Sequence, residues 1–181
     1  MLAQAMQIRP MGEDQLDAVL AVQAACYPPA MQEPAAVVLA RLRAAPRTTL
    51  VACDGDAVCA YLFAYPSLLG RVTPLDAPFT PAAKPDTLYL HDLAVAPPAL
   101  GLGLARRLAQ HALDAAAGQG LRHAALVSVQ DTRRFWEGLG FERDGGRAPC
   151  AALASALATA LATYPGSALY MTKRLIASSA A

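Results

Sequence analysis

Apolar residues recur at helical spacing in several segments of the chain. The clearest case is 13–26, where Leu16, Val19 and Leu20 share one stripe and Tyr27-Pro28-Pro29 ends the segment. The same spacing, bounded by glycine or proline, predicts further helices over 33–44, 103–117 and 132–139, and an alanine-rich helix over 148–162.

Runs rich in β-branched and aromatic residues predict strands over 7–10, 48–53, 57–65, 87–95, 121–129, 141–143 and 167–175. The clearest hairpin joins 48–53 to 57–65 through Asp54-Gly55-Asp56, because glycine supplies the positive φ of a tight turn. Strand 87–95 is nearly continuous in apolar content apart from His91 and Asp92, which is typical of a strand covered on both faces.

The predicted order is β-α-α-β-β-β-α-β-α-β-α-β, and it indicates an α+β fold with one sheet and helices on both faces. Neither a repeat nor a composition break divides the chain, so we expect a single domain over 1–181 with its core at about 7–175. The stretch 66–86 holds Pro66, Pro74, Pro78, Pro81 and Pro85 and is too long for a mere connector, so it is a candidate binding loop or lid.

Composition narrows the functional classes. The chain is 55% hydrophobic, but its longest apolar stretch, 148–162, is shorter than the roughly 20 residues of a membrane-spanning helix. Net charge is +1 without a long basic run, which argues against nucleic-acid binding. The first residues lack a secretory signal pattern, so a cytoplasmic location is expected.

The four cysteines form no C-x-x-C pair and no metal-like cluster with the histidines, which favours free thiols and no bound metal. Cys53 and Cys59 flank the predicted hairpin turn and could face each other across it, so a disulfide there is the open alternative.

The most informative segment follows strand 87–95 and contains a Gly101-Leu102-Gly103 turn at the start of a predicted helix. Glycines let the backbone approach a ligand closely, and the free amides of a helix start attract an anion such as a diphosphate. A dinucleotide-binding motif would need a third glycine where Arg106 stands, and a P-loop would need a Gly-Lys pair that the chain does not contain.

Two motifs together resemble the GNAT superfamily of acetyltransferases. Leu93-Ala94-Val95 followed by Gly101–Ala105 is similar to its motif A, and Phe135–Phe141 is similar to its motif B. The resemblance implies a three-layer fold whose central sheet is mixed, mostly antiparallel, with splayed middle strands. It also implies acetyl-CoA as co-substrate, and a small-molecule or protein amine as acceptor. A homodimer is compatible with it.

The resemblance assigns coenzyme binding to residues of the strand end, the turn and motif B, namely Leu93, Ala94, Val95, Leu100, Gly101, Leu102, Gly103, Leu104, Ala105, Arg106 and Trp136. Backbone amides near Leu93 and Val95 are expected to polarise the thioester carbonyl.

The chain departs from the family pattern in its polar residues. Pro98 and Leu100 replace the usual glutamine or arginines of motif A, so phosphate binding must rely on backbone amides and affinity is expected to be modest. Val129 replaces a frequent asparagine, and Trp136 replaces the tyrosine that often serves as general acid. These departures leave open an alternative, a catalytically silent module that binds acyl-CoA.

His91 is the best candidate for the general base, because histidine titrates in the useful range and a related position carries glutamate in some family members. Strand alternation predicts that His91 faces the same side as Tyr89, Leu93 and Val95, and that Asp92 faces the other side as a structural acceptor. The candidate acids are Tyr89, Tyr164 and Tyr170, of which Tyr170 is the preferred one.

Overall fold

The computed structural model describes residues 6–144, 151–164 and 166–176. Its centre is a seven-stranded sheet of order β1-β2-β3-β4-β5-β7-β6. Every pairing is antiparallel except that of β4 with β5, which is parallel. The strands are β1 (Gln7–Pro10), β2 (Thr49–Asp54), β3 (Ala57–Ser67), β4 (Thr87–Val95), β5 (His123–Ser128), β6 (Glu142–Arg143) and β7 (Leu169–Arg174).

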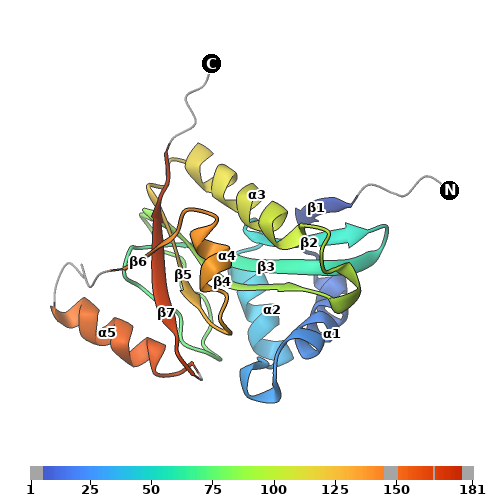
Figure 1. Ribbon diagram of the computed structural model, residues 1–181, viewed down its shortest axis with the longest axis horizontal. Helices are drawn as coiled ribbons and strands as arrows, with labels where there is room; N and C mark the ends of the chain where they lie inside the picture. The colour runs from blue at the N-terminus through green and yellow to red at the C-terminus, as the bar shows by residue number, and fades with distance from the viewer. Residues whose placement is uncertain (1–5, 145–150, 165, 177–181) are drawn as a thin grey trace.

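Helices cover both faces of the sheet (Figure 1). One face packs against α3 (Leu104–Gly118) and α4 (Arg133–Glu137) in a core that includes Leu108 and Phe141. The opposite face packs against α1 (Leu16–Cys26) and α2 (Ala35–Ala44) in a second core, which α5 (Ala151–Leu161) also contacts. The predicted three-layer mixed fold is therefore confirmed.

The observed order of elements agrees with the predicted order, and the differences lie at the ends. The first predicted helix begins as a 3-10 turn at Glu13–Gln15 before α1. Helix α2 starts at Ala35 because Pro34, extended at its N-cap, cannot take part in the preceding turn. Residues 145–150, including Cys150 and the start of the predicted 148–162 helix, lie outside the described residues.

The alternative of a Cys53–Cys59 disulfide is wrong, since both thiols are free. The register of β2 and β3 shifts between Ala52 and Cys53, so that Cys53 lies opposite Val58. Cys53 therefore packs in the core beside α1 and α2, whereas Cys59 packs against the core beside α3.

A bulge in β4 changes the direction of its side chains. Adjacent β3 residues Phe63 and Ala64 pair with Asp92 and Leu90, which leaves His91 as the extra residue in the ladder. His91 and Asp92 consequently both face the side of α1 and α2, where they meet Glu33 and Tyr61 respectively. The predicted alternation, with Asp92 on the far side from His91, is wrong because an extra residue resets the period.

The same bulge separates His91 from Leu93 and Val95, two of the three residues expected to share its face. Leu93 and Val95 pack against the core beside α3, while Tyr89 shares the face of His91, as predicted, in the core beside α1 and α2. After the bulge, His91 and Asp92 face α1 and α2, whereas the apolar side chains of Leu93 and Val95 face α3.

The middle strands splay apart. Parallel pairing between β4 and β5 stops at Leu90 and Leu126, although both strands continue. On its other edge β4 stays paired with β3, and the Ala96 N–H donates to Cys59 O at 2.8 Å. Because backbone groups of an antiparallel strand alternate in direction, the N–H groups of Leu93 and Val95 point into the gap.

Candidate functional site

A cavity of about 330 Å³ occupies the gap between β4 and β5. Its walls come from the end of α1, the diverging halves of β4 and β5, and α4. The predicted coenzyme residues that line it are Leu93, Ala94, Val95, Leu100, Ala105 and Trp136, and the predicted base His91 lines it as well. The structure therefore brings most of these residues around one space.

Side chains at the C-terminal end of α1 and just after it also contact this part of β4. The Tyr27 hydroxyl donates to Leu93 O at 3.2 Å, and the Cys26 thiol donates to Val95 O at 3.2 Å. The carbonyl and N–H of one residue in an antiparallel strand point the same way. These two bonds therefore agree with amides of Leu93 and Val95 that face the cavity and could bind a carbonyl oxygen there.

The glycine turn lies at the mouth of the cavity, between the lining residues Leu100 and Ala105. Gly101 and Gly103 have φ of +83° and +71°, which strain a residue with a side chain, and a Cβ at either would meet nothing within 4 Å. Gly103 is the N-cap of α3, so the free amides of that helix start face open space. The turn leaves room for an anion at the backbone.

The other predicted residues of the turn contribute differently. The Leu104 side chain is buried in the core, so only its backbone is available to a ligand. Leu100 and Leu102 are 65% and 57% exposed, so the turn presents two large apolar side chains to solvent. The exposed Arg106 donates to Gly138 O at 3.2 Å, which ties the start of α3 to the end of α4.

Trp136 forms part of the cavity wall. It is almost buried and makes edge contacts with Phe135 and Phe141 at centroid distances of 4.8 and 5.6 Å. Phe135 also lines the cavity. The aromatic pair of the second motif thus has both a packing role and one surface turned toward the gap.

His91 is held on the inner side of the gap. Its side chain is 1% exposed, and its Nε2 lies 3.3 Å from Glu33 Oε2. Its Nδ1 is buried without a hydrogen-bond partner among the described residues. His91 also lines a second, smaller cavity next to the first, together with Glu33. His91 therefore has one nitrogen fixed by a carboxylate and one left for another group.

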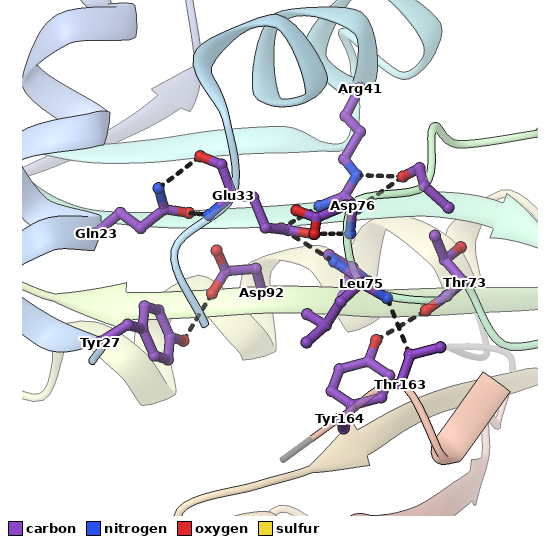
Figure 2. A network of polar contacts seen from close by, with 12 residues as sticks. Gln23, Tyr27, Glu33, Arg41, Thr73, Leu75, Asp76, Asp92, Thr163 and Tyr164 are labelled. Carbon is purple, nitrogen blue, oxygen red and sulfur yellow. Dashed lines mark hydrogen bonds and ion pairs between the residues drawn. The ribbon is translucent and has the colours of Figure 1, made fainter. Parts of the chain in front are cut away.

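Glu33 is the centre of a buried polar network (Figure 2). Its Oε1 accepts from the Asp76 N–H at 2.9 Å, while Oε2 accepts from Arg41 and faces His91. Arg41 in turn donates to Ala77 O at 2.9 and 2.6 Å. Burial raises the pKa of Glu33, but the hydrogen bonds and charges of His91 and Arg41 outweigh it and hold the pKa at about 2. A charged Glu33 thus ties the proline-rich loop to the predicted base.

Asp92 forms a second buried polar cluster. Its carboxylate accepts from the Tyr27 hydroxyl at 2.6 Å and from the Tyr61 hydroxyl at 2.7 Å (Figure 2 shows the first bond). Burial raises the pKa of Asp92, and the two tyrosine hydrogen bonds offset this only in part. Asp92 and Tyr27 line the cavity, so they lie in the same site as His91, although neither was predicted from the sequence as a catalytic candidate.

The predicted tyrosine acids lie elsewhere. The Tyr170 hydroxyl accepts from the Gly70 N–H at 2.8 Å, and burial raises its pKa to about 12. Tyr164 donates to Thr73 O at 2.7 Å and borders only the smaller cavity (Figure 2), while Tyr89 is fully buried. None of these three lines the larger cavity. Sequence reasoning missed Tyr27, for which no local signal exists apart from its place at the end of a helix.

The part of the chain that the structure describes contains no helix long and apolar enough to cross a bilayer. Among the described residues, no three histidine, cysteine or acidic side chains are grouped in a way that could hold a metal ion.

Comparison with protein families gives one match, in which the profile of the acetyltransferase (GNAT) family covers residues 16–141. This range contains both motifs and every residue that lines the cavity. No curated protein sequence matches the chain.

Solved structures resemble the fold over nearly its full length. The GphF GNAT-like decarboxylase in complex with isobutyryl-CoA has a TM-score of 0.71 at 18% identity, covering 94% of this chain and 100% of that one. Arabidopsis thaliana Naa50, bound to a CoA-peptide bisubstrate analogue, has 0.65 at 14% identity, covering 93% and 98%. The Escherichia coli ribosomal-protein-S18-alanine N-acetyltransferase has 0.64 at 14% identity, covering 94% of both chains. At these identities the likeness shows the fold.

Proposed function

The chain belongs to the acetyltransferase (GNAT) family, and we propose that it transfers an acetyl group from acetyl-CoA to a primary amine of a small molecule or protein. The family match and the similar structures that contain CoA or acyl-CoA support acyl transfer from CoA. Peptide and protein amines are the acceptors named for two of the similar proteins. A cytoplasmic location and a possible homodimer stay predictions from the sequence.

One observation carries the proposal: two free strand amides share a cavity with an anion-ready glycine turn at its mouth. The turn and the start of α3 would bind the coenzyme diphosphate through backbone N–H groups. The pantetheine arm would then enter the gap, where the N–H groups of Leu93 and Val95 would hold the thioester oxygen. Donors placed for that oxygen stabilise the negative charge it gains during attack.

His91 is the proposed general base. A lysine-like amine is neutral in less than about one part in 1,000 at pH 7, so its proton must be removed before it attacks. Glu33 fixes the imidazole through Nε2, which leaves Nδ1 as the nitrogen available to the amine. The contact between Glu33 and His91 is the one expected of a carboxylate that orients a catalytic histidine.

The proposal is tested by measuring free thiol release from acetyl-CoA with a panel of primary amines. His91→Gln is expected to lower kcat by about 100-fold while the Kd of acetyl-CoA stays the same. The matched control is His111→Gln, because His111 is exposed on α3 and away from the cavity. If no amine produced thiol release, the proposed reaction would be contradicted. If His91→Gln released thiol as fast as wild type, the proposed base would be contradicted.

A silent acyl-CoA-binding module is the second candidate. Leu100 stands where an arginine is usual and is 65% exposed, and Trp136 stands where a tyrosine acid is usual. An indole N–H is a donor but not a usable acid. A chain that is thermally stabilised by acetyl-CoA, yet acetylates no amine, would favour this candidate over the enzyme.

A further inference from the structure

One hydroxyl group lies in the gap next to the strand that would hold the thioester. Tyr27 follows the last residue of α1, and its hydroxyl bonds both Asp92 Oδ1 at 2.6 Å and Leu93 O at 3.2 Å. Leu93 also supplies one of the amides proposed to hold the thioester oxygen. The Tyr27 hydroxyl is therefore close to the position where the carbon–sulfur bond would break.

Transfer of the acetyl group leaves a thiolate that needs a proton. Trp136 cannot supply it, and Tyr170 and Tyr164, whose hydroxyls contact the backbone of the loop after β3, do not line the cavity. Of the tyrosines among the described residues, only Tyr27 lines the cavity. Its pKa is raised by burial and by the charge of Asp92, so the phenol stays protonated and can give its proton to sulfur only as a protonated Asp92 returns one to the Tyr27 oxygen.

We propose that Tyr27 and Asp92 form a proton relay that delivers a proton from the acceptor amine to the departing coenzyme thiolate. This inference rests on the proposed function and adds the acid that the reaction lacks. Tyr27 gives its proton to the sulfur, and Asp92 returns a proton to the Tyr27 oxygen.

The protons balance over one turnover. An ammonium acceptor first loses one proton to His91, which passes it to solvent. The amine nitrogen then bonds to the acetyl carbon, and its second proton moves to Asp92. As the carbon–sulfur bond breaks, its electron pair stays on sulfur, Tyr27 gives its proton to sulfur, and Asp92 gives its proton to the Tyr27 oxygen. The products are the amide and the free thiol.

The properties of Asp92 suit this role. It is buried, and the burial that raises its pKa lets the carboxyl carry a proton for a short time. It lines both the larger cavity, proposed for the thioester, and the smaller one beside the proposed base His91. While Asp92 is charged, it accepts the Tyr27 hydrogen bond; when it is protonated, it donates instead and frees the Tyr27 proton for sulfur.

Tyr61 provides a matched control. Its hydroxyl donates to the other oxygen of the same carboxylate at 2.7 Å, but its side chain does not line the larger cavity. Tyr61→Phe and Tyr27→Phe thus remove equivalent hydrogen bonds from Asp92, but only Tyr27→Phe removes a proton donor from the gap.

The test measures kcat and KM for both variants with the best amine found. Tyr27→Phe is expected to lower kcat by about 100-fold with little change in the KM of acetyl-CoA, and Tyr61→Phe by less than about threefold. Equal losses in the two variants would overturn the relay, because they would show that Tyr27 acts only by holding Asp92. Thermal unfolding of both variants verifies that each is folded.

A second measurement changes the leaving group. Acetyl-seleno-CoA releases a selenolate, a much weaker base than a thiolate, which departs without a proton. The kcat of Tyr27→Phe is expected to recover to within about fivefold of wild type with this donor, whereas a structural defect would persist. A defect that stays at full size would overturn the assignment of Tyr27 as the acid.

The relay also predicts how two losses combine. Asp92→Asn keeps an acceptor for Tyr27 but cannot carry a proton, so Tyr27→Phe/Asp92→Asn is expected to be no slower than the slower single variant. Multiplied losses would overturn the coupling. A wild-type chain that acetylates no amine would overturn the proposed function and the relay together, whereas an active wild type with an unimpaired Tyr27→Phe would overturn the relay alone.

Discussion

The two sides of the gap between β4 and β5 are built from different parts of the polypeptide. The side proposed for the coenzyme consists of backbone: two strand amides, a glycine turn and a helix start, with apolar side chains around them. The side proposed for the acceptor, next to His91, consists of buried ionisable side chains, centred on Glu33 and Asp92. We expect the first side to tolerate changes of side chain and to fail when the backbone is strained. The second should fail when a single charge is removed.

The largest effect is expected on the acceptor side, from Glu33→Gln. Glu33 and Arg41 are both buried, so the variant leaves Arg41 without its counter-charge and should cost about 3 kcal/mol of unfolding free energy at pH 7. Chemical denaturation measures this loss. The control is Glu13→Gln, because the Glu13–Arg43 pair is exposed and should change the unfolding midpoint little.

The same carboxylate predicts a pH dependence. The pKa of Glu33 is lowered from 4.5 to about 2 in the folded chain. The stability it contributes is therefore fully present above about pH 4.5 and is lost as the pH falls toward 2. Wild type and Glu33→Gln should converge in stability over this range, and a constant difference down to pH 2 would contradict the assigned charge.

On the coenzyme side, Gly101→Val and Gly103→Val are expected to abolish acetyl-CoA binding, a loss of at least about 100-fold by calorimetry. Both positions have positive φ, so valine would strain the backbone and occupy the space above the amides. Gly120→Val is the matched control, with φ of +82° in the turn after α3 and open space around it. It should bind normally; normal binding by the first two variants would refute the phosphate cradle.

A gain of affinity would sharpen the comparison. Leu100→Arg restores a charged side chain at the mouth of the cavity and should tighten acetyl-CoA binding about three- to fivefold at low salt, less at high salt. Leu102→Arg tests position, since Leu102 is similarly exposed but does not line the cavity. An equal gain in both variants would indicate a general charge effect.

The smallest effect is expected for Arg106→Ala, which should weaken coenzyme binding only about twofold. The guanidinium already donates to Gly138 O, and the side chain is exposed to water. A loss beyond about tenfold, measured by the same titration, would mean that Arg106 and not the backbone holds the phosphates.

The structural parts of the proposed coenzyme side could be predicted from the sequence because their signals are local. The turn and the strand end lie within a few residues of each other, and the order of helices and strands follows from periodicity. The acceptor side depends on contacts between distant residues. Glu33 meets His91 from 58 residues away, and Tyr27 meets Asp92 from 65 residues away. The spacing of residues along the chain cannot predict such pairs.

The bulge in β4 was missed for a related reason. Alternation describes a regular strand, and the extra residue at His91 depends on how β3 pairs with β4 across the sheet. The apolar content of 87–95 is the same with or without it. The limits of α2, α3 and α4, by contrast, were off by only one or two residues, because proline and glycine fix them locally.

The extra residue in β4 has a consequence for engineering. It sets the rotation between the half of the strand that carries Tyr89 and Leu90 and the half that carries Leu93 and Val95. Substitution at any of these positions keeps that phase, whereas deletion or insertion of one residue would turn one half over with respect to the other. A variant library for new acceptors should therefore vary residue identity at fixed strand length, and place all changes of length in the loop between β3 and β4.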